Sequence, residues 1–160
     1  MALTTLGNTA FGTSSVVSAT LKDSAVVYNK LDANTAHIDR NQTFTGRNTY
    51  SAAQRGSISA LGVQTSTVTL NMNNANHFSL TANGNITIAN PTNTTAGQSG
   101  SITVVANGSY TTSFGSHWRF ATGTAPTLST VAAKQDRIDY YVFSSNTIHA
   151  VATIDLLGTA

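Results

Sequence analysis

The chain has 160 residues, of which 40% are hydrophobic and 9% charged, and its formal net charge is +2. This composition excludes intrinsic disorder over most of the chain, because disordered chains combine low hydrophobicity with high net charge. The chain has no cysteine, which excludes disulfides, thiol catalysis and cysteine-based zinc sites, and the small charge surplus excludes a nucleic-acid-binding patch.

The N-terminal segment shows a short repeat with a period of ten residues. Ser15-Val16-Val17 followed by Leu21-Lys22-Asp23 is echoed by Ala25-Val26-Val27 followed by Leu31-Asp32. One such unit is too small to enclose a core, so we expect it to stack, to pair with other chains or to lie on a neighbouring protein. Two ordinary amphipathic turns of one small domain are the alternative. Residues 1–45 are therefore predicted to form an extended stalk or docking arm, followed by a β domain at 46–160.

This arm carries charges of both signs. Five of the eight basic residues precede Gly56, and three aspartates lie among them. Mixed charge favours ion pairing with a partner surface. The start of the chain lacks the features of a secretory signal, and no window approaches about 18 apolar residues, so we expect no membrane insertion.

The segment from Gly56 to Trp118 contains no Asp, Glu, Lys or Arg. Apolar and polar residues alternate there with a period of two, as at Val68, Leu70 and Met72, which predicts short half-buried strands. Asn83-Gly84 and Asn107-Gly108 are typical of hairpin turns. So few ionisable groups offer almost no general acid, base or metal ligand, which favours a structural or binding protein over an enzyme.

Two stronger strands are predicted near the C-terminus, at 137–143 and 147–154, with Ser144-Ser145-Asn146 as a hairpin-length link. Bulky residues on both faces of these runs favour central strands that are covered on both sides. About eight short strands with frequent turns favour a mainly β fold, an antiparallel β-sandwich of jelly-roll type.

No catalytic constellation stands out. There is no Gly-x-Ser-x-Gly elbow, and Asp136 and Asp139, the two carboxylates that lie close together in the β region, are expected to face opposite sides. The four histidines lack metal-ligand spacing, although a threefold axis near His149 would bring three imidazoles to one ion. We therefore predict no catalytic residues, no metal and no cofactor.

An aromatic cluster between Tyr110 and Phe120 is the best candidate for ligand contact, because aromatic faces beside hydroxyl and amide groups suit sugar rings. Trp118 and Phe120 are two residues apart and are expected to point into the core. Tyr110, Phe114 and His117 are the candidate contacts with a receptor.

Several segments together resemble the C-terminal β module of tailed-bacteriophage fibre and virion-decoration proteins, and the arm resembles the short repeats that precede such modules. The likeness covers about residues 41 to 155 and rests on Asn41-Gln42-Thr43-Phe44-Thr45-Gly46, Gly84-Asn85-Ile86-Thr87, Pro91-Thr92-Asn93, Gly97-Gln98-Ser99-Gly100-Ser101-Ile102, Trp118-Arg119-Phe120, Gly123-Thr124-Ala125-Pro126-Thr127-Leu128, Asp136-Arg137-Ile138-Asp139-Tyr140-Tyr141-Val142 and Ile148-His149-Ala150-Val151.

The resemblance implies a homotrimer made in the host cytoplasm and located on the virion, at the tail or on the capsid surface. Its partners would be itself, other virion proteins (a tail adaptor, the baseplate or the major capsid protein) and a host surface glycan. The arm would dock on the particle through Val16, Val17, Leu21, Lys22, Val26, Val27, Lys30, Leu31 and Arg40.

Three functions stay open. The first is a short tail fibre or spike that presents its β domain to the host surface. The second is a capsid decoration or cement protein that stabilises the head, and the third is a cellular carbohydrate-binding module. Complete fibres are usually much longer than 160 residues, so a long shaft is missing here.

Overall fold

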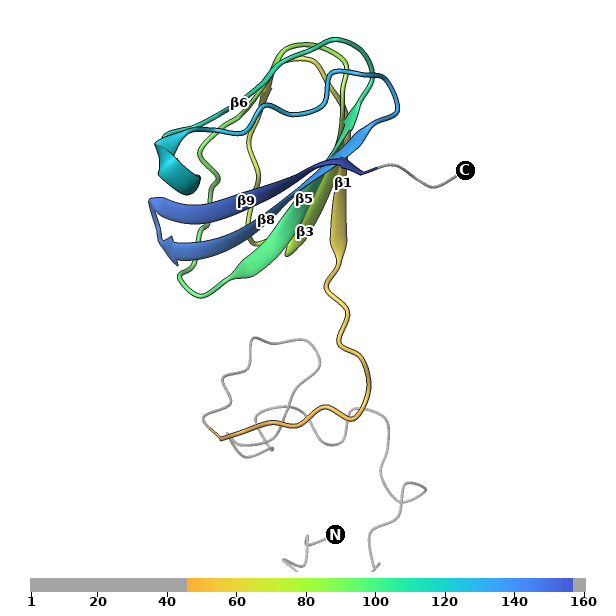
Figure 1. Ribbon diagram of the computed structural model, residues 1–160. Helices are drawn as coiled ribbons and strands as arrows, with labels where there is room; N and C mark the ends of the chain where they lie inside the picture. Colours follow the sequence, from red (N-terminus) through yellow and green to blue (C-terminus); the bar gives the residue numbers. More distant parts are fainter. Residues whose placement is uncertain (1–45, 157–160) are drawn as a thin grey trace, which may run out of the picture. The chain divides into compact units, whose positions relative to one another are not determined.

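The computed structural model describes residues 46–156, which form a mainly β structure with mixed sheets (Figure 1). The compact unit in this range begins at Ala52, and the predicted arm lies outside the described residues. The described elements are, in chain order, β1 (Ile58–Gln64), β2 (Thr67–Val68), β3 (His77–Ala82), β4 (Ile86–Ile88), β5 (Ser99–Ala106), β6 (Thr112–Phe114), β7 (Trp118–Arg119), the 3-10 turn η3 (Ala121–Gly123), β8 (Gln135–Ser144) and β9 (Thr147–Leu156).

The strands form two sheets. A six-stranded sheet has the order β1-β3-β5-β8-β9-β7, and Figure 1 shows its first five strands side by side. The second sheet has the order β2-β4-β6. Both sheets contribute inward side chains to one core, in which Ile88, Ile102, Ile138 and Ile148 have no exposed surface.

The first six strands form stacked coils, because the chain passes alternately through the two sheets. In the first sheet β1 pairs in parallel with β3, and β3 with β5. In the second sheet β2 pairs in parallel with β4, and β4 with β6. The register places Ile58 beside His77 and His77 beside Ser101, so one coil takes roughly 20 to 25 residues. The antiparallel part of the fold is β5-β8-β9, which closes the coils on one side.

The predicted antiparallel, jelly-roll-like arrangement is therefore wrong in its strand directions for β1 to β6. The hairpins predicted at Asn83-Gly84 and Asn107-Gly108 are wrong for the same reason, since these pairs link β3 to β4 and β5 to β6, which lie in different sheets. They are corners of the coils. A Cβ on Gly84 would lie 2.7 Å from the carbonyl oxygen of Thr65, so glycine permits the close approach of the chain there.

Asparagine side chains join consecutive coils at this corner and at the corner that follows β2 and β4. Asn107 Nδ2 donates to Asn83 Oδ1 at 3.1 Å, and Asn93 Nδ2 donates to Asn71 Oδ1 at 2.8 Å. Adjacent strands lie about 4.8 Å apart, so an ionised side chain at such a position would lie close to its equivalent in the next coil. Stacking thus gives a physical reason for the uncharged composition of the segment from 56 to 118.

The contact between equivalent side chains predicts that charges placed at Asn83 and Asn107 affect stability non-additively. Replacing both residues with Asp is expected to lower the free energy of unfolding at pH 7 by about 1 kcal/mol more than the sum of the two single replacements, because two carboxylates would face each other. This additional loss of stability should vanish at about pH 3, where most carboxyl groups are protonated. Urea unfolding of the four proteins at both pH values measures it, and additive losses at pH 7 would contradict the electrostatic explanation.

The predicted hairpin near the C-terminus is confirmed. β8 and β9 pair antiparallel through the tight connection after Ser144. Within a single chain, however, only one face of these strands is covered. Inward residues of β8 such as Ile138 and Val142 are fully buried, whereas the outward residues Tyr141 and Phe143 are 46% and 60% exposed.

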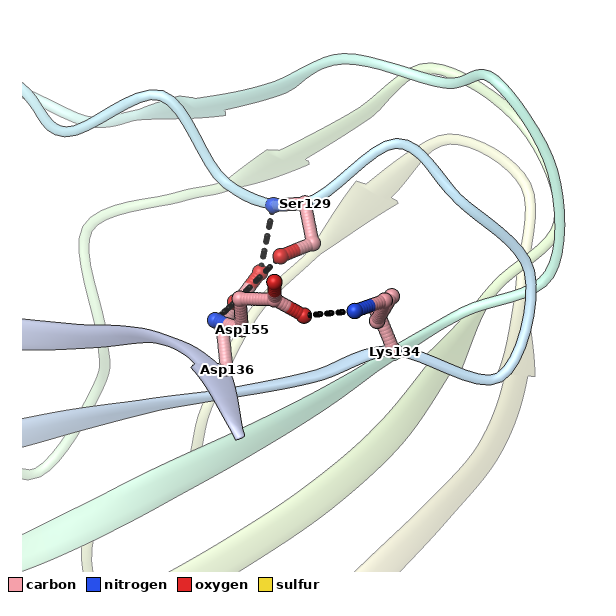
Figure 2. A network of polar contacts seen from close by, with 4 residues as sticks. All are labelled: Ser129, Lys134, Asp136 and Asp155. Atoms are coloured by element: carbon pink, nitrogen blue, oxygen red, sulfur yellow. Dashed lines mark hydrogen bonds and ion pairs between the residues drawn. The ribbon is translucent and has the colours of Figure 1, made fainter. Parts of the chain in front are cut away.

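A buried carboxylate ties the ends of this hairpin to the preceding loop (Figure 2). Asp136 is 1% exposed and accepts hydrogen bonds from the backbone N–H of Ser129 at 2.6 Å, from the Ser129 hydroxyl at 2.7 Å and from the backbone N–H of Asp155 at 2.7 Å. Lys134 forms an ion pair with Asp155 beside them. Asp136 is thus a structural residue that holds the loop and the end of β9 together.

Tyr140 connects β8 to the turn that follows the first coil. Its hydroxyl donates to the carbonyl oxygen of Asn76 at 2.7 Å, and its ring meets that of Trp118 edge-on at a centroid distance of 6.2 Å. Burial raises the pKa of Tyr140 to about 12. The neutral phenol is therefore favoured in the folded state.

The raised pKa of Tyr140 predicts a loss of stability at alkaline pH. Because the phenol of the unfolded chain ionises near pH 10, the stabilisation is complete below about pH 10 and is lost as the pH rises to about 12. Over this interval, wild type is expected to lose on the order of 1 to 2 kcal/mol more than Tyr140→Phe. Unfolding titrations at pH 9 to 12 measure the difference, and parallel curves for the two proteins would contradict it.

Candidate functional site

Two surfaces of the described structure carry features that point to binding. The first is a hollow beside β6, with a volume of about 360 Å³. This volume lies within the range of small-molecule sites, which is about 300 to 1,000 Å³. Residues on both of its walls offer hydroxyl groups and apolar surface: Thr111, Thr112, Ser113, Phe114, Pro126 and Thr130.

The walls of this hollow come from two segments held by the core. One wall is β6, whose pairing with β4 places Thr112 beside Ile86 and Phe114 beside Ile88. The other wall is the loop that leads to Ser129, where the buried Leu128 anchors the chain and Asp136 binds the next residue. Hydroxyl groups beside an aromatic ring can hydrogen-bond and stack on a sugar.

The three candidate receptor contacts are all half-buried, and one of them lines this hollow. Phe114 lines it and is half-buried, and its ring meets that of Phe120 edge-on at a centroid distance of 4.7 Å. Tyr110 is half-buried just before β6, and its ring packs against Gly108.

His117 is also half-buried, and its backbone N–H donates to Asn90 Oδ1 at 2.8 Å. Its Nδ1 atom is buried and has no hydrogen-bond partner among the described residues. The expected inward orientation of Trp118 and Phe120 is confirmed, because Trp118 is 5% exposed and Phe120 packs against the core.

The second surface is the outward side of the six-stranded sheet, which we call the outer face. Outward residues are small and polar in the middle of the sheet, at Ser79, Ser101 and Thr103, and His77 Nδ1 lies 2.9 Å from Ser101 Oγ. Bulky apolar residues lie on both sides of this polar strip. Ile58 and Val63 on β1 are 68% and 62% exposed.

The β8-β9 part of the outer face is aromatic. Val151 is 68% exposed, and the ring of His149 stacks on that of Phe143 at a centroid distance of 5.3 Å and an interplanar angle of 13°. Arg137 and Asp139 form a partly exposed ion pair at 3.0 Å. A hollow of about 700 Å³ lies next to the turn η3 and is lined by residues that include Arg119, Asp139, Tyr141, His149 and Val151.

The outward side of the three-stranded sheet differs from the outer face. Its residues are hydroxylic, namely Thr67, Thr87 and Ser113, and the Oγ1 of Thr87 lies 2.8 Å from the Oγ of Ser113. Large apolar side chains are exposed on one sheet and absent from the corresponding side of the other, within residues 46–156. The two sheets therefore present surfaces of different chemistry.

The carboxylates of the described chain all have structural contacts. Asp136 and Asp139 lie on opposite sides of β8, as expected: Asp136 is buried in the network of Figure 2 and Asp139 pairs with Arg137. Among residues 46–156, no three His, Asp or Glu side chains form a group that could hold a metal ion. No helix in this range is long and apolar enough to cross a membrane.

The candidate docking residues Val16, Val17, Leu21, Lys22, Val26, Val27, Lys30, Leu31 and Arg40 lie outside the described residues. Comparisons of the chain with protein-family models, with characterised proteins and with solved structures found no match.

The outer face is not among the sites predicted from the sequence. Its signal was present in the alternating residues of β8 and β9, where Tyr141, Phe143, His149 and Val151 occupy every second position. These residues indicated a second covered face, because bulky side chains on both sides of a strand are usually buried. The structure shows them exposed instead.

Proposed function

We propose that the chain is a non-enzymatic structural protein of a bacteriophage virion. In this proposal it forms a short homotrimeric tail fibre or spike, with residues 1–45 attached to the particle and the β domain directed at the host surface. The resemblance of residues 41 to 155 to fibre and decoration modules suggests the class of protein. The fold adds a physical argument for a rigid projecting module.

The observation that carries the proposal is the stack of uncharged coils. Parallel strands in two sheets are joined along the stack by backbone hydrogen bonds and, at the corners, by asparagine side chains. Each coil is stabilised mainly by its neighbours, and the hairpin β8-β9 covers one side of the stack. Such a module keeps its shape without disulfides or metal ions, which suits a protein exposed on a particle.

The hollow beside β6 supports a role in glycan contact. It combines three consecutive hydroxylic residues, Thr111, Thr112 and Ser113, with the ring of Phe114. One such site would bind a sugar weakly. A trimer would present three copies, and multivalent attachment to a surface raises the overall affinity strongly.

A capsid decoration protein is the second candidate. The observation that favours it is the exposed apolar outer face, since such a face can also pack against a capsid shell. Copy number separates the two functions. Gold labelling of intact particles with an antibody against the β domain should mark the tail, at about tens of copies, for a fibre. Labelling over the whole head at hundreds of copies would establish decoration, and particles without label would refute both.

Host contact through the hollow is tested with the purified full chain. We expect Thr111→Trp, which fills the hollow from an exposed position, to weaken binding to host cells at least about tenfold. The matched control is Thr67→Trp, which places the same side chain at an exposed position on the same sheet. Equal binding by both variants would refute the hollow as the contact site.

A further inference from the structure

We infer that the outer face of the six-stranded sheet is the surface through which copies of this chain pack against one another. The inference rests on the proposed homotrimer and goes beyond it by assigning the interface. Three observations carry it: the concentration of exposed apolar side chains on this face, the size of the face, and its complementary halves.

Of the nine large apolar residues that are exposed in the described structure, five lie on the outer face, and the other four are Tyr50, Val131, Ile154 and Leu156. Ile58, Val63, Tyr141, Phe143 and Val151 all project from the same side of one sheet, each at least 46% exposed. Isolated exposed apolar residues are ordinary, whereas their concentration on one face, here in two groups on either side of a polar strip, marks an interaction surface. The outward side of the other sheet, with Thr67, Thr87 and Ser113, shows that this fold can be built with a fully polar exterior.

The area of the face is sufficient for association. Six strands spaced about 4.8 Å apart, with an average length of roughly seven residues at about 3.3 Å per residue, cover on the order of 650 Å². A ring in which half of each face meets the other half of the next face buries roughly 650 Å² at each contact and roughly 2,000 Å² over the three contacts of a trimer, so each copy is held on two sides. A single sugar or short peptide would leave most of this surface exposed to solvent.

The two halves of the face differ in a way that suits another copy of the same chain. The β1 side carries the apolar residues Ile58, Ala60 and Val63, all of them exposed. The β8-β9 side carries the hollow of about 700 Å³ beside η3, with the aromatic ring of Tyr141 in its wall. Contact between the β1 side of one copy and the hollow of the next uses both halves, and a repeated contact of this kind forms a closed ring when three rotations complete a full turn.

The face also carries charges of both signs. Arg137 and Asp139 form a partly exposed pair, and the exposed Arg119 lies in the same row as Tyr141 and His149. The small polar residues in the middle of the sheet allow the faces of several copies to approach an axis closely. The occupant inferred here is therefore another copy, and residues 1–45 are the competing occupant that the experiment separates.

The experiment compares charged variants of the full chain by sedimentation equilibrium at micromolar concentration. Wild type is expected at about three times the 16.6 kDa mass of the chain. The double variant Ile58→Lys/Val151→Lys is expected to dissociate at least 100-fold more readily. Val151 lies opposite Asp139 in the register, so a lysine there pairs with a carboxylate and the fold is retained. The control is Val131→Lys, because Val131 is 61% exposed on a loop away from the outer face.

A second measurement introduces no charge. The chain has no cysteine, so Val151→Cys and Val131→Cys each create one thiol. In the assembled protein we expect Val151→Cys to react with a thiol reagent at least tenfold more slowly than Val131→Cys.

The outcomes distinguish the two claims. A trimer that the double lysine variant leaves intact, with equal labelling rates, refutes the interface and leaves the proposed trimer standing. A wild-type monomer refutes both. Protection of Val151→Cys in the monomer, lost when residues 1–45 are deleted, would show that the arm covers the face and would refute packing between copies.

Discussion

Replacing Asp136 with Ala is expected to lower the free energy of unfolding by about 3 to 5 kcal/mol. The carboxylate is 1% exposed and accepts three hydrogen bonds, two from backbone N–H groups and one from the Ser129 hydroxyl. Alanine leaves these donors buried without an acceptor, and burying an unsatisfied polar group costs the full desolvation of that group. Urea unfolding measures the loss.

Two graded variants separate the network from a general effect of substitution. Ser129→Ala removes one of the three hydrogen bonds and is expected to cost about 1 kcal/mol. Asp136→Asn keeps the shape but turns an amide N–H₂ toward a donor, and its cost should lie between the other two. The amide of Asp155 should exchange faster in Asp136→Ala, because its acceptor is lost. If Asp136→Ala costs no more than Ser129→Ala, the network does not anchor the hairpin.

The second large effect is expected at Gly100, where alanine should cost about 3 kcal/mol. A Cβ at this position would collide with the carbonyl oxygen of Asn76 and would lie 2.7 Å from the Tyr140 hydroxyl. That carbonyl cannot move freely, because it accepts hydrogen bonds from the backbone N–H of Ser101 at 3.1 Å and from Tyr140 at 2.7 Å. Alanine therefore forces the turn of one coil away from β5.

The matched control for Gly100→Ala is Gly46→Ala, since a Cβ on Gly46 has nothing within 4 Å. Its cost should stay within about 0.5 kcal/mol. Adding Tyr140→Phe to Gly100→Ala removes the clash with the hydroxyl and should restore only part of the loss, because the clash with the backbone remains. Thermal unfolding compares the variants, and equal melting temperatures for Gly46→Ala and Gly100→Ala would show that the coils separate without cost.

The uncharged segment from Gly56 to Trp118 matches the stacked coils closely. It begins just before β1 and ends at the first residue of β7. Composition alone indicated a segment with almost no general acid or base, which is a statement about chemistry. The stacking of the coils adds a structural cause, because equivalent side chains such as Asn83 and Asn107 lie in contact.

The alternation of apolar and polar residues predicted the C-terminal strands and their hairpin well. The alternation of Ile138, Tyr140 and Val142 with exposed residues defined β8, and a tight link after Ser144 defined the hairpin. The same alternation placed Asp136 and Asp139 on opposite sides of the strand. These features depend only on the two-residue period of an extended chain, which a sequence displays directly.

The candidate sites were predicted less completely. Phe114 was a candidate because of its type and its position near a turn, and it lines the hollow beside β6. The other wall of that hollow, at Pro126 and Thr130, comes from a loop whose position depends on the hydrogen bonds between Ser129 and Asp136. No local pattern reports a contact between segments of this kind.

The sequence therefore determined that the chain forms β-strands, which side of each strand enters the core, and that few ionisable groups are present for chemistry. Only the tertiary structure decided which strands pair, in which direction, and which outward side remains exposed. The physical reason is that parallel and antiparallel strands share the same two-residue period, and that Asn-Gly suits both a hairpin turn and the corner of a coil. The partner of β3 is chosen by contacts about 20 residues away along the chain, where β1 and β5 stack beside it.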